Sequence, residues 1–326
     1  MLMTRTPVRI SLGGGGTDLP SYYQRFGGLV ISAAINRYIY ITINRTFTPD
    51  YFLKYSELER VKKIADIRHG IFREALALHQ IDPAVEIVSL ADIPAETGLG
   101  SSGAFTVGLL KALYGFKREH VVANALAEEA CHIEIERLGG SVGKQDQYIA
   151  AFGGLTCFEF ATDGTVRVSP LRLSNKTLHN LEEHLLLFFT GYTRKAEALL
   201  QDQKTRSETG DQAMLENLHT VARIGREVKC ALEAGDLCGF AALMHQHWEH
   251  KRARSGGMSS GNIDRWYEIA RAHGALGGKL VGAGGGGFML FYAEDPSALR
   301  EAMAAEGLAE LRFDFDLDGS VVLVRD

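Results

Sequence analysis

Glycine gathers in three short clusters, and this feature limits what the chain can fold into more than any other. The clusters lie at residues 13–16, 98–103 and 284–287, and the chain holds 36 glycines among 326 residues, more than the usual share of about 7%. A flexible linker would mix glycine with serine over a long tract, whereas each cluster here is short and flanked by apolar runs. Glycine has no Cβ, so it lets the backbone approach another group closely. The pattern predicts three loops that lie against a ligand.

The middle cluster lies in the segment PAETGLGSSGA, residues 94–104, and an apolar stretch with helical character follows it. Its small residues expose consecutive backbone N–H groups, and the positive N-terminal end of the helix adds to them. Such a loop is suited to nucleotide phosphates. Ser101 and Ser102 can cap the helix, and a hydroxyl at this place can also ligate Mg²⁺. The simpler alternative is an ordinary serine-capped helix after a glycine turn.

Two other phosphate-binding motifs fit the middle cluster poorly. Gly98, Gly100 and Gly103 satisfy the pattern G-x-G-x-x-G of dinucleotide-binding folds. That motif needs its first glycine at the tip of a strand, but residues 91–97 separate Gly98 from the strand predicted at 85–90. No Gly-Lys-Ser or Gly-Lys-Thr follows any cluster, so a P-loop is excluded. A nicotinamide-dependent oxidoreductase is therefore a weak alternative.

The first and third clusters both adjoin strand-like segments. In the first, a strand leads into four glycines and then Thr17 and Asp18, which suits a pocket where backbone lies against a polyhydroxylated ligand. The third leads into the apolar run that begins at Phe288. In isolation, the first is equally explained by a flexible hairpin tip and the third by a β-bulge or tight bend. Three such loops in one chain favour a shared ligand site.

Carboxylates supply the remaining chemistry. Asp146 follows Lys144 in the segment GKQDQY, and an ammonium group nearby favours the ionised form of a carboxylate. Such a carboxylate can accept a proton from an attacking hydroxyl. The helical segment before it carries several more acidic residues, most of which we expect to be solvated: Glu128, Glu129, Glu134 and Glu136.

Charge and cysteine content narrow the class of protein. Lys and Arg number 35 against 40 Asp and Glu, for a net charge of −5, whereas nucleic-acid and anionic-membrane binders usually show a basic surplus. The four cysteines are far apart, so neither a structural zinc nor a disulfide framework is indicated. No run approaches the ~18 apolar residues of a membrane span, and no signal peptide is recognisable. We expect a cytoplasmic enzyme or binding protein, without nucleic-acid or membrane partners.

Strands and helices alternate irregularly, so the pattern favours an α+β fold over a doubly wound sheet. Interrupted periodicity near residues 173–181 predicts two domains, 1–175 and 176–326. We predict strands at 8–12, 28–35, 38–43, 85–90, 155–160, 166–168, 185–189 and 288–292. We predict helices at 58–80, 101–113, 119–138, 194–206, 214–234, 237–252, 262–273 and 297–306. Residues 311–315 and 321–324 are predicted to pair as a closing hairpin over an Asp-Gly turn.

The three glycine segments, in this order and spacing, resemble the three motifs of the GHMP small-molecule kinases, which include galactokinase, homoserine kinase and mevalonate kinase. The middle motif, P-x-x-x-G-L-G-S-S-G, is specific, and the resemblance covers essentially the whole chain. It implies an α+β N-terminal domain, a ferredoxin-like C-terminal domain, an active site in the cleft between them, and ATP with Mg²⁺ as cofactors.

The resemblance also implies roles for individual residues. Asp146, with Lys144 beside it, would be catalytic, and Arg9 would neutralise charge on the transferring phosphoryl group. Ser102 and Glu134 would hold Mg²⁺, with Glu136 as the alternative to Glu134. The residues expected to bind ATP are Pro94, Gly98, Leu99, Gly100, Ser101, Ser102 and Gly103. Those expected to contact the acceptor are Gly14, Gly15, Thr17, Asp18, Asp146, Gly284 and Gly285.

Galactokinases carry Glu and His where this chain has Gly15 and Gly16, which places galactose in doubt. The first motif, G-G-G-G-T-D-L-P, and the ending K-L-x-G-A-G-G-G-G-F are more similar to the bacterial D-glycero-D-manno-heptose 7-phosphate kinases. Those enzymes phosphorylate the anomeric hydroxyl, giving the 1,7-bisphosphate for nucleotide-activated heptose.

An acceptor that already carries a phosphate would need cations at its far end. The candidates in the second half are Arg194, Lys195, Lys251, Arg252 and Arg254. Relatives that act on L-fucose share the glycine-rich motif, so a free-sugar 1-kinase is the alternative. A non-catalytic sugar and nucleotide sensor on the same fold is a further alternative. A monomer or a homodimer is expected.

Overall fold

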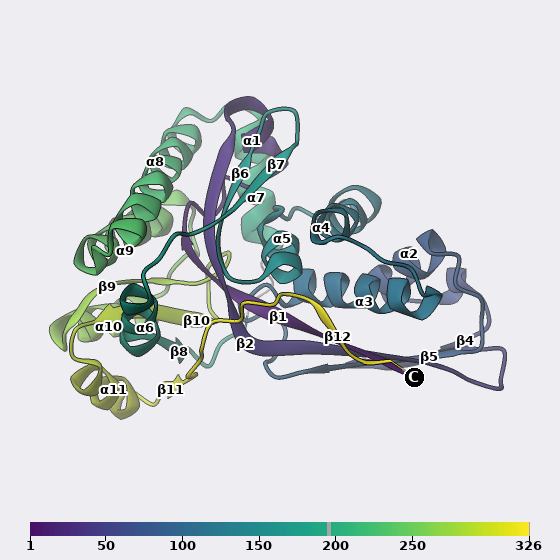
Figure 1. The fold of residues 1–326 in the computed structure, drawn as a ribbon. Helices are drawn as coiled ribbons and strands as arrows, with labels where there is room; N and C mark the ends of the chain where they lie inside the picture. Colours follow the sequence, from purple (N-terminus) through teal and green to yellow (C-terminus); the bar gives the residue numbers. More distant parts are fainter. Residues whose placement is uncertain (194–196, 326) are drawn as a thin grey trace.

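The computed structural model describes residues 1–193 and 197–325, and it has two lobes, each built on one β-sheet (Figure 1). The larger sheet has eight strands in the order β12-β1-β2-β5-β3-β4, with β6 paired to the early part of β2 and β7 paired to β6. Only β3 and β5 pair in parallel. The strands are β1 (Leu2–Gly13), β2 (Gly28–Arg45), β3 (Tyr51–Lys54), β4 (Leu58–Val61), β5 (Val85–Ala91), β6 (Leu155–Phe160), β7 (Val166–Pro170) and β12 (Val321–Arg325).

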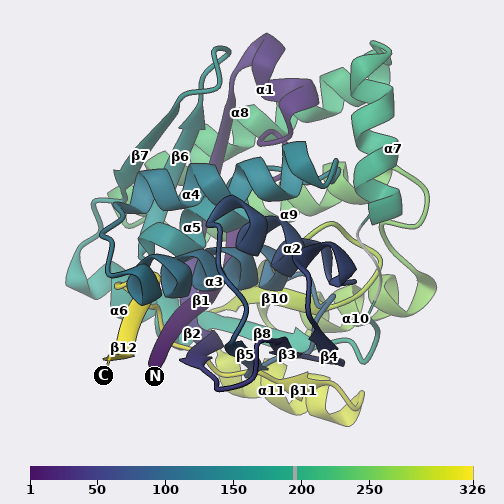
Figure 2. The same cartoon turned by 90° about the vertical axis from the view of Figure 1, so that its right-hand side faces the viewer.

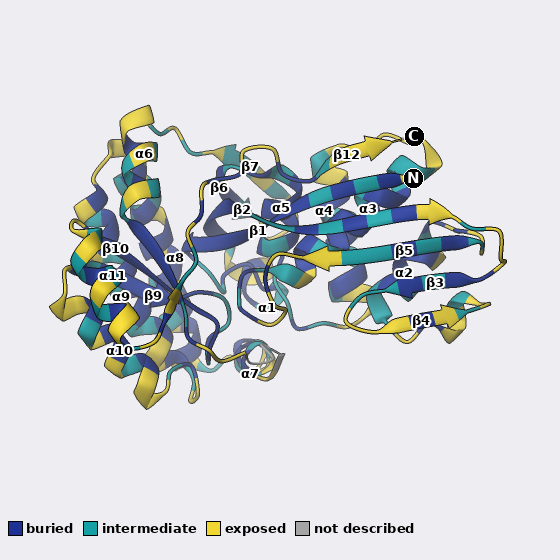
Figure 3. Cartoon of the chain, turned by 90° about the horizontal axis from the view of Figure 1, so that it is seen from below, coloured by how far each residue is buried: buried dark blue, intermediate teal, exposed yellow. Residues whose placement is uncertain are grey.

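Buried and part-exposed residues alternate along the second half of β2, as expected for a sheet that is covered on one face only. Ile39, Ile41 and Ile43 are buried, whereas Tyr40 and Thr42 between them are part-exposed, because successive side chains in a strand point to opposite faces. Figure 3 shows the open face, with buried and part-exposed residues alternating along β2 and β5. The two strands predicted at 28–35 and 38–43 are one continuous strand.

Helices cover the other face of the larger sheet (Figure 2). Helices α3 and α5 contact β1 and β2 directly, and α4 packs outside them, followed at once by a π-helical turn, η2. The long glycine-led helix α3 confirms the helix predicted at 101–113. The helical segments of this lobe are α1 (Pro20–Phe26), η1 (Ile64–Asp66), α2 (Gly70–Leu78), α3 (Ser101–Lys117), α4 (Ala123–Cys131), η2 (His132–Arg137) and α5 (Gln145–Phe152).

The smaller sheet has four antiparallel strands in the order β11-β8-β10-β9. With helices between β8 and β9 and between β10 and β11, this is the β-α-β-β-α-β order of a ferredoxin-like lobe. Its strands are β8 (Leu185–Phe189), β9 (Ala275–Leu280), β10 (Phe288–Ala293) and β11 (Ala309–Glu310). Its helices are α6 (Asn175–His184), α7 (Glu197–Glu208), α8 (Gln212–Ala234), α9 (Leu237–Arg254), α10 (Gly261–Ala272) and α11 (Pro296–Ala305).

The lobes share one apolar core. Helix α8 packs on α9 and also on β1 and β2, and buried residues of both lobes belong to a single cluster. The chain finally returns to the larger sheet, where β12 pairs with β1. The mixed α+β architecture confirms the predicted fold class, while the boundary between 175 and 176 stays a prediction. No helix among the described residues is long and apolar enough to cross a lipid bilayer.

Two predicted elements are wrong. Residues 58–80 do not form one helix, because the first part is strand β4, paired with β3, and only α2 is α-helical. Buried Glu59 fixes this geometry by accepting hydrogen bonds from the backbone N–H groups of Arg68 and His69 at 2.7 and 3.1 Å. Residues 311–324 do not form a hairpin either, since β11 pairs with β8 and β12 pairs with β1.

Candidate active site

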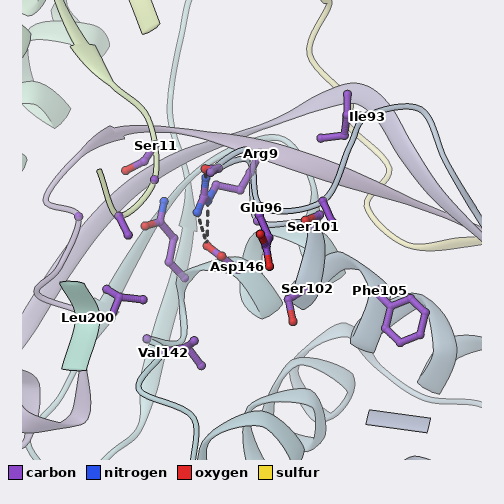
Figure 4. Close-up of a pocket in the computed structure, with 18 of the residues that line it drawn as sticks. Arg9, Ser11, Ile93, Glu96, Ser101, Ser102, Phe105, Val142, Asp146 and Leu200 are labelled. Carbon is purple, nitrogen blue, oxygen red and sulfur yellow. Dashed lines mark hydrogen bonds and ion pairs between the residues drawn. The ribbon is translucent and has the colours of Figure 1, made fainter. Parts of the chain in front are cut away.

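A cavity of about 860 Å³ lies where the two lobes meet (Figure 4). The larger sheet contributes β1, β5 and the loop after β1, and the ends of α3 and α5 complete that side. The other side comes from α7, α9 and β9. The residues predicted for the site that line the cavity are Arg9, Gly15, Asp18, Gly98, Gly100, Ser101, Ser102, Asp146, Lys251 and Arg254.

The middle glycine cluster forms a loop that ends at the first turn of α3. Gly98 and Gly100 have φ angles of +81° and +76°, in the left-handed region that favours glycine. A Cβ on Gly98 would lie 2.7 Å from the carbonyl oxygen of Val281, so this loop packs backbone to backbone against the start of the third cluster. The predicted ATP contacts of Pro94 and Leu99 are not supported, because neither lines the cavity and Leu99 is buried in the core.

Asp146 lies in the first turn of α5, whose N-terminal end meets that of α3. A Cβ on Gly103 would lie 2.7 Å from Cβ of Asp146, so Gly103 acts by allowing this approach and does not line the cavity. Arg9 donates from Nε to Oδ1 of Asp146 at 2.8 Å and from Nη1 to the carbonyl oxygen of Gly98 at 2.5 Å. The side chain of Asp146 is 30% exposed and lines the cavity. Arg9 thus joins this carboxylate to the glycine loop at 98–103, which is predicted to bind phosphate.

Lys144 does not lie beside the carboxylate of Asp146, contrary to the prediction. Its Nζ donates to both carboxylate oxygens of Glu128 at 2.9 Å and to the carbonyl oxygen of Gly164 at 3.2 Å. Lys144 precedes α5 and Asp146 is in its first turn, and residues two apart on a helix do not face each other. The cation at the carboxylate is Arg9.

Asp18 is buried in the cavity wall and is held by backbone groups. It accepts hydrogen bonds from the N–H groups of Gly16 at 3.0 Å and Gln145 at 3.1 Å. Burial raises the pKa of Asp18, and the neighbouring Asp146 carboxylate raises it further. A Cβ on Gly143 would lie 1.9 Å from Oδ2 of Asp18, so glycine at this position makes room for the carboxylate. Asp18 and Asp146 are therefore neighbours in one wall.

The loop that carries Asp18 divides into lining and supporting residues. Gly15 and Gly16 line the cavity, but Gly14 and Thr17 do not, so direct acceptor contacts from the latter two are not supported. The buried hydroxyl of Thr17 lies 2.9 Å from the carbonyl oxygen of Gly14 and 3.0 Å from that of Leu29. A Cβ on Gly14, which has a φ of +76°, would lie 1.9 Å from the same Leu29 oxygen. Both residues act through the shape of the loop.

Glu134 reaches the start of α3 from the π-helical turn η2, a geometry often found at functional sites. Its carboxylate accepts hydrogen bonds from the hydroxyl of Ser102 at 2.8 Å and from Nε2 of Gln147 at 3.1 Å. Burial raises the pKa of Glu134. The alternative, Glu136, lies on the surface and pairs with His132 at 2.8 Å.

The hydroxyl of Ser102 and the carboxylate of Glu134 are hard oxygen donors of the kind that Mg²⁺ prefers. Among the described residues, no group of three or more His, Cys, Asp or Glu side chains could hold a metal ion. Mg²⁺ in kinase sites is commonly bound by one or two protein oxygens together with substrate phosphates. The two residues fit that arrangement.

The second lobe places four basic side chains, all buried, in the cavity wall: His247, Lys251 and Arg254 on α9, and Lys279 on β9. Burial lowers the pKa of Arg254 to about 10. Burial and the nearby guanidinium groups of Arg9 and Arg254 lower the pKa of Lys279 to about 7. The sequence interpretation missed Lys279 and His247, although a lysine among the small and apolar residues of a strand is a usable signal.

Arg252, one of the predicted acceptor cations, does not join this group. Arg252 lies outside the cavity, with a side chain 37% exposed, and donates from Nη2 to Glu249 at 2.7 Å. Lys251 and Arg254 are three residues apart and share a face of α9, whereas Arg252 is turned away from it. Arg194, like Lys195, lies outside the described residues.

The predicted contacts of Gly284 and Gly285 with the acceptor are not supported either. A Cβ on Gly284 would lie 2.7 Å from Sδ of Met258, and the N–H of Gly285 donates to the carbonyl oxygen of Met258 at 3.0 Å. Gly282 and Ala283, which come just before the third cluster, line the cavity instead. The glycines of that cluster serve close packing of loops.

An apolar wall beside the phosphate loop was not predicted. It suits a planar base, because ligand pockets combine apolar surface with a few polar groups. Its residues come from separate segments, and each is indistinguishable in the sequence from an ordinary core residue. They are Ile39, Tyr55, Ile71, Leu90, Ile93 and Phe105.

Comparisons with known proteins identify the family of this chain. The model of the GHMP kinases N terminal domain matches residues 60–154, and that of the GHMP kinases C terminal region matches residues 229–309. The D-glycero-alpha-D-manno-heptose 7-phosphate kinase of Campylobacter jejuni is 32% identical over 305 residues, which are 90% of this chain and 89% of that protein. The chain belongs to the GHMP kinase family.

Other GHMP kinases are similar along most of the chain. The crystal structure of a D-glycero-D-manno-heptose 1-phosphate kinase from Bacteroides thetaiotaomicron has a TM-score of 0.80 and 26% identity, covering 100% of both chains. The L-fucokinase/L-fucose-1-P guanylyltransferase of Bacteroides fragilis is 27% identical over 90% of this chain and 35% of that protein. This GHMP kinase is a sugar kinase, which transfers a phosphoryl group from ATP to an alcohol acceptor.

Proposed function

We propose that this GHMP kinase phosphorylates the anomeric hydroxyl of D-glycero-D-manno-heptose 7-phosphate to give the 1,7-bisphosphate, for nucleotide-activated heptose and surface polysaccharide. The observation that carries the proposal is the carboxylate of Asp146, held by Arg9 between the phosphate loop and the Asp18 loop. The 32% identity to a heptose 7-phosphate kinase supports the choice of acceptor. The reaction would take place in the cytoplasm, where ATP and sugar phosphates are available.

In the proposed reaction, the acceptor oxygen bonds to the γ-phosphorus of ATP while the bond to the β,γ-bridging oxygen breaks and ADP leaves. Asp146 takes the hydroxyl proton on Oδ2, because both guanidinium contacts of Arg9 go to Oδ1. Positioning and charge stabilisation supply most of the catalysis in phosphoryl transfer. The charge of Arg9 and the free N–H groups at the start of α3 stabilise the phosphoryl oxygens.

ATP and the sugar would bind at different ends of the cavity. The base of ATP would lie on the apolar wall, and its phosphates in the loop at 98–102. Mg²⁺, held by Ser102 and Glu134, would neutralise charge on the phosphate oxygens. The sugar would lie against Gly15, Gly16 and Asp18, where the absence of side chains on the glycines leaves room for it.

Two alternatives remain distinct from this proposal. A 1-kinase for a free sugar such as L-fucose would use the same carboxylate but would not need a cationic pocket. A non-catalytic sensor would need neither a base nor a phosphoryl-stabilising cation, so the Arg9–Asp146 pair favours turnover. We expect a monomer or a homodimer, because described residues of one chain line the cavity from both lobes.

The decisive experiment measures ADP release with heptose 7-phosphate, heptose, mannose, fucose, galactose and mevalonate as acceptors. Phosphorus NMR then locates the new phosphate. A large preference for heptose 7-phosphate with a product phosphorylated at the anomeric carbon supports the proposal. Equal or better turnover of a free sugar replaces it with the free-sugar kinase, and no turnover of any acceptor favours the sensor.

A further inference from the structure

We propose that Arg254, Lys251 and Lys279 form a subsite for the phosphate group that the acceptor carries before the reaction. This inference rests on the proposed function, because it takes the reacting end of the sugar to lie at Asp146. The ligand class is a sugar phosphate bound as a dianion. The subsite would therefore be the part of the cavity that distinguishes the phosphorylated sugar from the free one.

The first argument is an imbalance of buried charge. Arg9 is paired with Asp146, but in the part of the chain that the structure describes no ion pair joins Arg254, Lys251 or Lys279 to a carboxylate. The three side chains are between 2% and 6% exposed. Burying a cation without a counter-charge is costly, so such clusters are retained where an anion completes them. The phosphate dianion of the acceptor sugar would supply the missing negative charge.

The second argument is that hydrogen bonds hold the guanidinium group of Arg254 in place, while its Nη2 group has no partner among the described residues. Its Nε donates to Oδ1 of Asn217 on α8 at 3.0 Å, and its Nη1 donates to Oε1 of Gln203 on α7 at 3.1 Å. Its Nη2 is buried and, among the described residues, has no hydrogen-bond partner. Since Arg254 lines the cavity, the guanidinium is oriented in advance to donate to a ligand oxygen there.

The third argument is the position of Arg254 on the acceptor side. A Cβ on Gly16 would lie 2.7 Å from Nη1 of Arg254, and Gln203 donates to the carbonyl oxygen of Gly16 at 2.8 Å. Asp18 interacts electrostatically with both Asp146 and Arg254. A sugar with its reacting hydroxyl at Asp146 and other hydroxyls at Asp18 would therefore present its far end to Arg254. In a heptose 7-phosphate, that end carries the phosphate.

The two lysines extend the same subsite. Nζ of Lys251 donates to the carbonyl oxygens of Leu280, at 2.8 Å, and Gly282, which leaves the third donor of its ammonium group. Nζ of Lys279 lies 3.3 Å from Nδ1 of His247. Burial and the nearby guanidinium groups of Arg9 and Arg254 lower the pKa of both lysines, and a bound dianion would oppose that effect by favouring their charged forms.

The phosphates of ATP are the other anionic groups that these three cations would be able to bind. Gly282 packs against Gly98 of the phosphate loop, where a Cβ on Gly282 would lie 2.5 Å from Cα of Gly98, so Lys251 is near both substrates. The experiment must therefore measure the sugar preference and the KM for ATP separately.

The test compares kcat/KM for heptose 7-phosphate and for heptose, at matched ionic strength, in the wild type and in Arg254→Gln, Lys279→Met and Arg252→Gln. Loss of a charged hydrogen bond to phosphate is expected to lower the ratio of the two efficiencies on the order of tenfold to a hundredfold in the first two variants. The KM for ATP should change less than the KM for heptose 7-phosphate. Arg252→Gln removes a charge from the same helix outside the cavity and should keep the wild-type ratio.

Each outcome has one meaning. An equal loss on both sugars in Arg254→Gln and Lys279→Met would overturn the subsite, as would a raised KM for ATP with an unchanged sugar ratio. If the wild type itself uses both sugars equally, the proposed acceptor fails instead, whatever the variants do. Thermal melting with and without heptose 7-phosphate checks folding independently, and the ligand-induced rise in Tm should be smaller in both cavity variants than in the wild type. If Arg254→Gln does not fold, Lys279→Met on β9 still decides the question.

Discussion

Arg9 and Asp146 are 137 positions apart, yet both Nε and Nη2 of Arg9 lie 2.8 Å from the same carboxylate oxygen, Oδ1 of Asp146. Among the described residues, none donates a hydrogen bond to Oδ2. Oδ1 is therefore bound by the guanidinium group that orients the carboxylate, and Oδ2 is available to a substrate. This division allows a carboxylate to be held firmly and still accept a proton.

The variant Asp146→Asn tests the proton-accepting role. Asn cannot accept the hydroxyl proton, and general base assistance typically contributes 10²–10⁴-fold, so kcat should fall by about that factor. The binding of ATP should change little, because the phosphate loop provides it. Steady-state kinetics and calorimetric titration of ATP measure the two effects. A kcat above about a tenth of the wild-type value would remove Asp146 from this role.

The variant Gly103→Ala tests the contact between α3 and α5. The added methyl group would lie 2.7 Å from Cβ of Asp146 and 3.0 Å from its carbonyl carbon, so it should displace the carboxylate. A misplacement of about 1 Å can cost on the order of 10²-fold in kcat. Overpacking should also lower the free energy of unfolding by about 1–3 kcal/mol. Gly256→Ala is the control, since a Cβ there meets no atom within 4 Å; similar kcat values for both variants would contradict the prediction.

The variant Ser102→Ala tests the predicted magnesium contact. Without the hydroxyl, the Mg²⁺ concentration for half-maximal velocity should rise on the order of tenfold, a change typical for losing a group that orients a bound metal. The KM for the sugar should change less. Ser101→Ala serves as the matched control and should act mainly through loop shape. Indistinguishable Mg²⁺ titrations for Ser102→Ala and the wild type would show that Ser102 holds no metal.

Proton uptake on binding tests the state of Lys279. Burial, with Arg9 and Arg254 nearby, lowers its pKa to about 7, so at pH 8 the ligand-free side chain is mostly neutral, and a phosphate dianion should draw a proton onto it. His247 and Lys251, whose pKa values are also lowered, face the same group and titrate with it. Calorimetry of heptose 7-phosphate binding at pH 8, in buffers of different ionisation enthalpy, should show net uptake. Zero uptake or proton release contradicts the prediction, and Lys279→Met should reduce the uptake.

The lowered pKa of Lys279 also determines how the free energy of unfolding changes with pH. The unfolded chain holds the proton of Lys279 up to about pH 10.4, whereas the ligand-free folded chain releases it near pH 7. Between these values the unfolded state binds more protons, so this lysine makes the free energy of unfolding rise with pH in that window. Denaturant unfolding at pH 7.5 and 9.5 in the wild type and in Lys279→Met isolates the contribution. A slope with pH that is equal in the two proteins would contradict it.

Local sequence signals predicted the elements that local interactions determine. The helix at 101–113 follows a glycine loop and has a long apolar run, and the structure confirms it as α3. The failed hairpin at 311–324 had a good turn, but residues 311–315 form no strand. The short strand just before them, β11, pairs with β8, and residues 321–325 pair with β1, which is distant in the sequence. Alternation of apolar residues indicates that a strand exists but not which strand it pairs with. The same limit applies to residues 58–61, where pairing with β3 outweighs helical spacing.

In the candidate site, too, local sequence signals predicted some residues, while contacts between distant segments determine the rest. The glycine motif at 98–103 and the resemblance that singled out Arg9 and Asp146 point to residues that the structure brings together, while phosphate binding by that loop stays a prediction. Adjacency in the sequence misled at Lys144, because its long side chain runs to Glu128. Helical spacing could have separated Arg254 from Arg252, since only the former shares a face with Lys251. No sequence signal could have identified the apolar wall, whose members come from separate segments.

Strand β1, which carries Arg9, pairs with β2 on one side and with β12 on the other. During synthesis, residues 2–45 emerge early, but residues 321–325, which pair with β1, emerge only after the whole of the smaller lobe. The wall built from α9 and β9 is also made late. A nascent chain therefore carries an exposed edge on β1 until residues 321–325 have been made, and such edges invite pairing with other chains. We expect chaperone dependence to concentrate in the interval between the synthesis of β1 and the synthesis of β12.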